Sequence, residues 1–207
     1  MKRKIEHFKA FVRNKKIAVL GVGISNRPLI RYLSGIGCSI TAFDRLPADD
    51  PVIIRTRQEF AAEKIELTWS LGADYLSRLS GYDLIFRTPQ MRRDLGELVS
   101  ERNRGAVITS EMEVFMELCP APVIGITGSD GKTTTTTLIA MMLEKAGHKV
   151  HLGGNIGTPL LDRVETIQTS DQVVLELSSF QLMSMRKSPQ TAVITNISPN
   201  HLDIHKD

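Results

Sequence analysis

Cysteine, aromatic residues and a strong charge of one sign are all scarce in this 207-residue sequence. The two cysteines, Cys38 and Cys119, lie far apart and have no metal-ligand spacing, so reduced thiols are expected. A net charge of +3 gives no reason to expect a nucleic acid or a membrane as partner. No apolar run reaches transmembrane length, and the basic start lacks a signal-peptide core. The sequence therefore predicts a cytoplasmic protein.

Several catalytic and binding patterns are also missing. There is no Gly-x-Ser-x-Gly motif, no Cys-His pair and no alternation of basic and aromatic residues. These absences leave a hydrolase triad and single-strand nucleic-acid binding without support. What is present is the composition of an ordinary globular protein, with 42% hydrophobic and 24% charged residues.

Strand-like apolar runs alternate with helix-like segments along the whole chain. Residues 16–22, 27–33 and 38–43 predict a strand, a helix and a strand, which is how a dinucleotide-binding fold begins. Farther along, residues 57–62 predict a short helix and residues 65–68 a short strand. The alternation predicts an α/β protein with mainly parallel sheets. We expect a Rossmann-like domain at residues 1–118 and the first part of a P-loop ATPase-type α/β domain at residues 119–207. The chain stops directly after a strand, so the second domain is expected to be incomplete.

The main motif is GITGSDGKTTTTT, residues 125–137, which follows an apolar run and continues into a predicted helix. Gly128 and Gly131 allow a turn that presents backbone N–H groups to a phosphate, and Lys132 adds a positive charge. The Thr133 hydroxyl would then contact Mg²⁺. The spacing is shorter than in common P-loops, because Ile126 stands where the first glycine is usual. The alternative is a glycine-rich turn that only caps a helix.

A second glycine turn, GVGISN at residues 21–26, follows the first predicted strand. It is an imperfect dinucleotide fingerprint, since Asn26 stands where the third glycine belongs. Asp44 ends the next strand, close to where an acidic residue would meet a ribose hydroxyl. The turn supports a nucleotide-like ligand but not NAD in particular, and a tight turn without any ligand is the alternative.

Further polar residues follow the later predicted strands. Glu176 ends the apolar strand QVVLEL, where a carboxylate needs a partner, and an Mg²⁺ role is favoured over a buried ion pair. The loop GGNIG at residues 153–157 indicates close approach of the backbone to a neighbouring group. His201 and Asp203 lie on a final loop that either ligates metal or substrate or is simply a solvated chain end.

Four motifs in this order resemble the Mur ligases, which are ATP-dependent amide ligases of peptidoglycan precursor synthesis. They are TGSDGKTTT (127–135), GGNIG (153–157), LELSSFQL (175–182) and NISPNHLD (196–203). The SSFQL residues resemble the branch of the family that adds D-glutamate. The resemblance covers essentially the whole chain, including GVGISN and the Thr88-Pro89 turn.

The resemblance implies roles for individual residues. It assigns ATP phosphates to Gly128, Ser129, Asp130, Gly131, Lys132, Thr133 and Thr134. It assigns catalysis to Lys132, Glu176 and His201, and Mg²⁺ to Thr133, Glu176 and His201. It assigns the nucleotide-sugar substrate to Ile24, Ser25, Asp44 and Arg45 at the uridine diphosphate, and to Asn155 and Ser178 near the muramoyl-alanine end.

The resemblance also implies a reaction and its partners. A carboxylate of UDP-MurNAc-L-alanine would attack the γ-phosphate of ATP, and D-glutamate would capture the acyl phosphate. Nucleic acid and membrane are not expected as partners, and a monomer is expected. The metal-bridging lysine and the third domain of the family have no counterpart before Asp207. The chain alone is therefore expected not to ligate.

Some residues depart from the family pattern. Asn200 stands where an acidic residue often precedes the histidine, Gln90 replaces a glycine, and Arg45-Leu46 differs from the Thr-Arg of some relatives. The alternatives are a sibling Mur ligase, a folylpolyglutamate synthetase-type ligase, or a non-catalytic module that binds UDP-sugar or nucleotide. A signalling GTPase is disfavoured, because no Asn-Lys-x-Asp motif is present.

Overall fold

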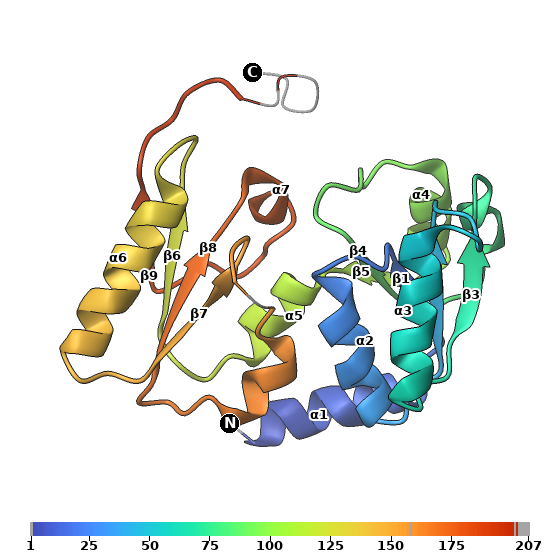
Figure 1. Ribbon diagram of the computed structural model, residues 1–207, viewed down its shortest axis with the longest axis horizontal. Coiled ribbons are helices and arrows are strands. Elements are labelled where there is room, and N and C mark those ends of the chain that lie inside the picture. Colours follow the sequence, from blue (N-terminus) through green and yellow to red (C-terminus); the bar gives the residue numbers. More distant parts are fainter. Residues whose placement is uncertain (1, 158, 201, 203–207) are drawn as a thin grey trace. The chain divides into compact units, whose positions relative to one another are not determined.

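The computed structural model describes residues 2–157, 159–200 and 202. The chain divides into two compact units, Met1–Val114 and Phe115–Asp207. Helices and strands alternate along both (Figure 1). All strand pairs within the described residues are parallel, so the predicted α/β class with parallel sheets is confirmed. The predicted division between residues 118 and 119 stays a prediction.

The first unit is built on a five-stranded parallel sheet with the order β3-β2-β1-β4-β5. Its elements are α1 (Lys2–Arg13), β1 (Ile17–Leu20), α2 (Asn26–Gly35), β2 (Ile40–Asp44), α3 (Pro51–Ala62), β3 (Thr68–Leu71), the 3₁₀ helix η1 (Tyr75–Arg78), β4 (Leu84–Arg87), α4 (Gly96–Asn103) and β5 (Val107–Thr109). Helix α5 (Glu111–Leu118) follows and crosses the division between the units. The strand order changes direction at β1 and β4, and ligands of open α/β sheets bind at the carboxyl ends of strands at such a point.

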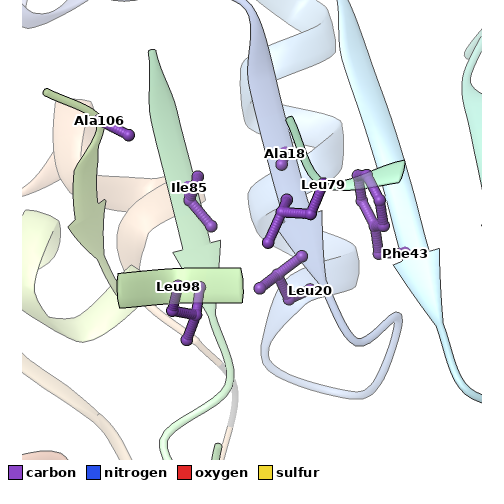
Figure 2. Close-up of a cluster of buried hydrophobic side chains, with 7 residues drawn as sticks. All are labelled: Ala18, Leu20, Phe43, Leu79, Ile85, Leu98 and Ala106. Atoms are coloured by element: carbon purple, nitrogen blue, oxygen red, sulfur yellow. The ribbon is translucent and has the colours of Figure 1, made fainter. Parts of the chain in front are cut away.

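The core of the first unit forms because its central strands are apolar on both faces. Every residue of β1 is buried, as expected for a parallel strand covered on two sides. Figure 2 shows Ala18 and Leu20 on one face of β1, where they gather with side chains from neighbouring elements. This cluster comprises Ala18, Leu20, Phe43, Leu79, Ile85, Leu98 and Ala106.

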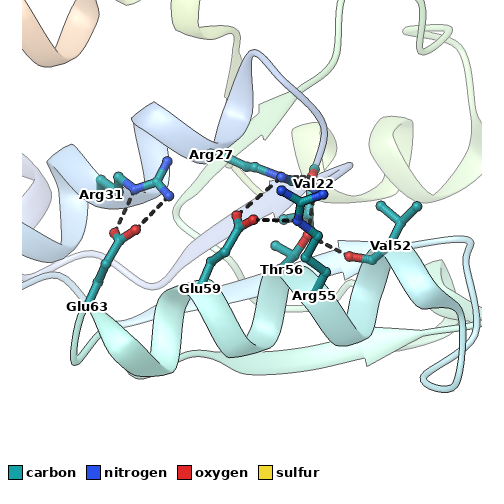
Figure 3. A network of polar contacts seen from close by, with 8 residues as sticks. All are labelled: Val22, Arg27, Arg31, Val52, Arg55, Thr56, Glu59 and Glu63. Atoms are coloured by element: carbon teal, nitrogen blue, oxygen red, sulfur yellow. Dashed lines mark hydrogen bonds and ion pairs between the residues drawn. The ribbon is translucent and has the colours of Figure 1, made fainter.

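Helices α2 and α3 are joined by a network of polar contacts (Figure 3). Arg31 makes a two-pronged ion pair with Glu63, with N–O distances of 2.6 and 2.7 Å. The hydrogen bond from Arg31 holds the pKa of Glu63 below its usual range. Arg27 donates to Thr56 at 2.6 Å and also contacts Glu59. The contacts fix α2 against α3 near the glycine turn that precedes α2.

The second unit is built on a four-stranded parallel sheet with the order β7-β8-β6-β9. Its elements are β6 (Val123–Thr127), α6 (Lys132–Lys145), β7 (Val150–Gly154), the 3₁₀ helix η2 (Leu161–Thr166), β8 (Gln172–Glu176), α7 (Ser179–Leu182) and β9 (Thr191–Ile194). Ala140 of α6 packs on Ile126 and Val174, so α6 covers one face of the sheet. Strands β6 and β8 are adjacent, which brings their carboxyl ends together.

Two predicted elements of the first unit lie elsewhere than the sequence indicated. Residues 57–62 were expected to be a short helix, but α3 begins at Pro51, where the Asp50 side chain caps Val52 N–H at 2.8 Å. Residues 65–68 were expected to be a strand, but Lys64 adopts a positive φ of 58° and Ile65 N–H bonds back to Phe60. That turn ends the helix and moves the start of β3 to Thr68.

Among the described residues, no helix is both long enough and apolar enough to span a bilayer.

Candidate phosphate and nucleotide sites

The main candidate site of the second unit lies where β6 and β8 end. Ile126 on β6 is in register with Glu176 on β8. The residues after β6 form the predicted phosphate loop, and the loop after β7 reaches the same edge through Gly154 and Glu176. The structure thus brings the predicted phosphate loop, Asn155 and Glu176 to one edge of one sheet.

The phosphate loop has the backbone geometry that its glycines allow. Gly131 is the N-cap of α6 with a φ of 76°, and Gly128 has a φ of 142°. A Cβ atom on Gly128 would lie 2.0 Å from the Thr195 hydroxyl. Within the described residues, the N–H groups of residues 131–134 have no acceptor, and they form the positive end of the α6 dipole. Such an arrangement binds anions.

Lys132 is folded over this loop. Its ammonium group donates to the carbonyl oxygens of Gly128 and Ser129 at 2.7 and 2.9 Å. The positive charge therefore lies at the loop itself, within reach of an anion bound there. The threonines that follow also bond locally, with Thr136 donating to the Lys132 carbonyl at 2.7 Å.

Glu176 is buried, and its two carboxylate oxygens are divided between two neutral donors. The Thr133 hydroxyl donates to Oε2 at 2.7 Å, and the Asn155 amide donates to Oε1 at 2.8 Å. Glu176 forms no ion pair with any described residue, so the alternative of a buried structural ion pair is not observed. A buried carboxylate without a cationic partner is suited to receive a cation.

Gly154 explains how the loop after β7 reaches Glu176 so closely. Its φ is 99°, and a Cβ atom there would lie 2.1 Å from the Glu176 carbonyl oxygen. The same carbonyl accepts the Asn155 N–H at 2.8 Å. Asn155 is therefore attached to Glu176 through both its backbone and its side chain.

Of the other two predicted residues of this unit, only Ser178 lies within the described residues. Ser178 is the N-cap of α7 and forms a capping box with Gln181, so its hydroxyl has a local structural role. His201, together with the neighbouring Asp203, lies outside the described residues.

A contact that the sequence did not indicate joins the phosphate loop to the segment after β9. The Asn196 side chain bonds to both the N–H and the carbonyl of Asp130, at 3.0 and 3.1 Å. The Ser129 and Ser198 residues bond to each other through a hydroxyl and a backbone N–H at 2.8 Å. The residues lie more than 60 positions apart in sequence, and only strand pairing of β9 with β6 brings them together.

The candidate site of the first unit lies at the turn after β1. Asp44 accepts the N–H of Val22 at 2.8 Å, and Asn26 donates to the carbonyls of Leu20 and Gly21 at 3.1 and 2.8 Å. Asn26 is buried, so the residue in the place of the third glycine ties the turn together. The sequence signal for this role was the amide side chain of Asn26, which can donate to two carbonyls.

Ile24 and Ser25 lie at the start of α2, and Ile24 is 82% exposed. Within the described residues, the N–H groups of residues 23–25 have no acceptor. Arg45 is exposed and follows β2. Ile24, Ser25, Asp44 and Arg45 therefore lie at the carboxyl ends of the adjacent strands β1 and β2.

Arg87 was not singled out in the sequence, although it is fully buried at the end of β4. Its guanidinium donates to the carbonyls of Thr88, Pro89 and Met91 at 2.9–3.1 Å. Burial lowers the pKa of Arg87. Arg87 holds the Thr88-Pro89-Gln90 turn, and the Thr88 methyl lies 2.7 Å from the place that a Cβ atom on Gly21 would take.

The fold and the two sites define a class of protein: a parallel α/β unit with a nucleotide-type turn, followed by a P-loop-type α/β unit. Residues 126–207 match the family described as the Mur ligase middle domain. This match assigns residues 126–207 to that family, and the relatives described next extend the similarity to the whole chain.

The chain is similar over its whole length to proteins named UDP-N-acetylmuramoylalanine--D-glutamate ligase. Identity is 55% to that of Acetivibrio thermocellus, 55% to that of Clostridium acetobutylicum and 56% to that of Ruminiclostridium cellulolyticum. The alignments cover 100% of this chain and 43–44% of the relatives. The chain therefore spans less than half the length of these relatives.

Solved structures of the same family share the fold. A UDP-N-acetylmuramate:L-alanyl-gamma-D-glutamyl-meso-diaminopimelate ligase from Neisseria meningitides has a TM-score of 0.55 at 22% identity, covering 93% of this chain and 64% of its own. A UDP-N-acetylmuramate-alanine ligase from Thermotoga maritima has a TM-score of 0.52 at 20% identity, covering 92% and 43%. At these identities the likeness concerns the fold alone.

Proposed function

We propose that this chain provides the nucleotide-sugar unit and the phosphate loop of an ATP-dependent amide ligase. The ligase would add D-glutamate to UDP-MurNAc-L-alanine. The observation that carries the proposal is the hydrogen-bonded set of Thr133, Glu176 and Asn155 beside a phosphate loop. The identity of 53–56% to D-glutamate ligases over the full chain supports the choice of substrates.

ATP is the proposed phosphate donor. The N–H groups of residues 131–134 would bind phosphate oxygens, and Gly128, Ser129 and Asp130 complete the loop. Lys132 would exchange its two carbonyl contacts for phosphate oxygens, which are stronger acceptors because they are charged. This exchange neutralises charge that moves toward the leaving ADP.

Mg²⁺ fits the oxygen donors of the site. Thr133 and Glu176 offer a hydroxyl and a buried carboxylate 2.7 Å apart, which are the hard ligands this ion prefers. Across residues 2–157, 159–200 and 202, no three or more His, Cys, Asp or Glu side chains form a metal cluster. Thr133, Glu176 and the phosphates would thus hold the ion, and His201 remains a proposed third protein contact. When bound, Mg²⁺ would neutralise phosphate charge.

The first unit would bind the uridine diphosphate. The free N–H groups of residues 23–25 suit a diphosphate at the start of α2, beside Ile24 and Ser25. Asp44 and Arg45 are the proposed contacts to the nucleoside. Asn155 and Ser178 are the proposed contacts near the muramoyl-alanine end. A UDP-sugar and ATP are cytoplasmic metabolites, so we propose that compartment, and a monomer.

The reaction would proceed in two steps. A carboxylate oxygen of the substrate attacks the γ-phosphorus, the bond between that phosphorus and the bridging oxygen of ADP breaks, and an acyl phosphate forms. The amine of D-glutamate then attacks the acyl carbon, and an amide, inorganic phosphate and a proton result. The protein contributes positioning and charge neutralisation.

Calorimetry of the purified chain tests the proposal. Mg·ATP and UDP-MurNAc-L-alanine should each bind, and Lys132→Ala should weaken only Mg·ATP. Binding of the UDP substrate without any binding of Mg·ATP would reject the ATP site. Binding of neither ligand by a folded chain would reject the whole proposal.

Phosphate release tests whether the chain acts by itself. We expect none that depends on D-glutamate from the purified chain when both other substrates are supplied. Substantial release of this kind would contradict the prediction that the chain alone does not ligate.

A further inference from the structure

The contact between Asn196 and Asp130 resembles a base pair between a side chain and a peptide group. The Asn196 Oδ1 atom accepts the Asp130 N–H at 3.0 Å, and the Nδ2 group donates to the Asp130 carbonyl at 3.1 Å. One amide side chain thus bonds to both backbone polar groups of one residue of the phosphate loop. We propose that Asn196 is a positioning residue of the phosphate loop, which it holds in the conformation that accepts phosphate.

Further hydrogen bonds join the same two segments, with donors on both of them. The Thr195 hydroxyl also donates to the Asp130 carbonyl at 2.6 Å, and the Ser129 N–H bonds to the Asn196 carbonyl at 3.2 Å. The Ser129 hydroxyl bonds to the Ser198 carbonyl at 2.7 Å. Residues 195–198 therefore run along residues 128–130 and bond to them at several points.

These bonds between residues 195–198 and residues 128–130, here called the clasp, determine which polar groups of the loop remain available to a ligand. The N–H groups of Ser129 and Asp130 are used by Asn196, whereas those of residues 131–134 have no acceptor within the described residues. A carbonyl oxygen directed at a phosphate would repel it. The Asp130 carbonyl is instead held by Thr195 and Asn196, on the side of the 195–198 segment. The clasp therefore keeps an acceptor away from the phosphate and leaves donors available.

Gly128 is the glycine that this arrangement requires. A Cβ atom at Gly128 would lie 2.0 Å from the Thr195 hydroxyl and 3.0 Å from the Asn196 carbonyl oxygen. The displaced glycine of the loop, which gives the motif its unusual spacing, thus lies where the 195–198 segment crosses it. The close approach of residues 195–198 to Gly128 therefore accounts for a glycine at this position of the motif.

The inference rests on the proposed ATP site, so its test has one arm without nucleotide. Asn196→Ala removes both side-chain bonds to Asp130. Gln190→Ala is the matched control, because Gln190 also bonds an amide side chain to a backbone group, the Val123 N–H at 2.7 Å, but at the amino end of β6. Hydrogen exchange of the Asp130 amide is measured by NMR without any ligand. Asn196→Ala should speed this exchange at least tenfold, and Gln190→Ala should leave it unchanged.

The second arm measures affinity. Asn196→Ala should weaken Mg·ATP binding about five- to tenfold, because net hydrogen bonds of about 1 kcal/mol are lost. Binding of UDP-MurNAc-L-alanine should stay within twofold, and Gln190→Ala should change neither affinity. Equal Mg·ATP affinity in Asn196→Ala and the parent chain would overturn the proposal, and so would unchanged Asp130 exchange. If the parent chain binds no Mg·ATP at all, the proposed function fails, and the exchange arm alone decides whether Asn196 positions the loop.

Discussion

The two units each place a glycine turn between a strand and a helix, but they hold that turn in different ways. In the first unit Asn26, which follows the turn after β1 directly, donates to two of its carbonyls, and Asp44 at the end of the adjacent strand β2 accepts the Val22 N–H. In the second unit the turn after β6 is held from outside by Thr195 and Asn196, across a strand pairing. The first turn thus has a buried amide side chain of its own helix start as a brace, whereas the second depends in addition on a segment more than 60 residues further along the chain.

The difference also separates the chemistry of the two turns. Lys132 places a full positive charge on the second turn, where its carbonyl partners are 2.7 and 2.9 Å away. The first turn has Arg27, but this guanidinium is engaged by the Val22 carbonyl, Thr56 and Glu59 (Figure 3). This difference supports the proposal that the second turn binds a triphosphate and the first a ligand held chiefly by backbone N–H groups.

The largest expected effect is a difference in unfolding free energy between alanine substitutions of Gly128 and Gly21, the glycines that begin the two turns. Gly128→Ala places a Cβ atom 2.0 Å from the Thr195 hydroxyl and at a φ of 142°, so we expect a loss of about 3 kcal/mol in unfolding free energy. Gly21→Ala meets only the Thr88 methyl, at 2.7 Å, and should cost about 1–2 kcal/mol at its φ of 85°. Chemical denaturation measures both values.

Spectroscopy assigns each loss to its unit. Trp69 is the only tryptophan and lies on β3, so its fluorescence follows the first unit, whereas circular dichroism follows both. Gly21→Ala should shift the fluorescence transition, and Gly128→Ala should shift mainly the dichroism transition. Equal losses from the two variants would remove the distinction between the turns.

The next effect concerns charge. Lys132→Ala should weaken Mg·ATP binding about 10- to 100-fold, since hydrogen bonds to charged groups contribute about 1.5–3 kcal/mol. Arg27→Ala is the matched loss of a cation at the other turn and should leave Mg·ATP affinity unchanged. Calorimetry with both variants checks this. An equal effect of the two changes on Mg·ATP would show that the second turn has no special role in phosphate binding.

A smaller effect is expected for the residue in the place of the third glycine. Asn26→Ala leaves the carbonyls of Leu20 and Gly21 without their side-chain donor, so we expect a loss of about 1–3 kcal/mol in unfolding free energy. Tryptophan fluorescence during denaturation measures it. Asn26→Gly would restore the fingerprint glycine without restoring the bonds, and it should be no more stable than Asn26→Ala. If Asn26→Gly were more stable than Asn26→Ala, the turn would favour the backbone freedom of glycine at this position.

These contrasts show which parts of the molecule the sequence could predict. Apolar runs located strands β1, β2, β6 and β8, and the Gly128–Lys132 motif and Glu176 could be placed because they end such runs. The strand near residue 65 was misplaced, because the positive φ of Lys64 is a property of one helix end that no apolar pattern records. The Asn196 contact could not be predicted, because it depends on pairing between strands that lie far apart in sequence.

Arg87 illustrates a further limit. An arginine at the end of a strand is usually exposed, so its sequence position alone indicates a surface residue. In the fold it is buried, and its three carbonyl partners belong to the next few residues. The tight turn of residues 88–91 makes this burial tolerable, and the turn follows from Pro89 and the packing at Gly21 rather than from hydrophobic periodicity.

The smallest expected effect lies at the opposite edge of the second sheet, away from the phosphate loop. Asp171 directly precedes β8, accepts the Gln168 N–H at 3.0 Å and faces His151 and Lys149 at 2.8 and 3.4 Å. The Gln168 N–H, followed by the His151 contact, holds the pKa of Asp171 below its usual range. A lowered carboxyl pKa adds stability above the unfolded pKa of about 3.9, and this stability is lost as pH falls through the folded value.

Asp171→Asn should therefore lower the melting temperature at pH 6–7, and the gap from the parent chain should begin to narrow near pH 4 and close as pH falls through the lower folded pKa. Asp162→Asn on η2 is the matched control, because Asp162 is exposed and the same change there should leave no gap at any pH. Mg·ATP affinity should be unchanged in both variants, since the ion pairs lie at the amino ends of β7 and β8 and the phosphate loop lies at the carboxyl ends. A loss of Mg·ATP affinity in Asp171→Asn would show that the amino ends and the carboxyl ends of these strands are coupled. The ion pairs at the amino ends would then no longer be separate from the proposed phosphate site at the carboxyl ends.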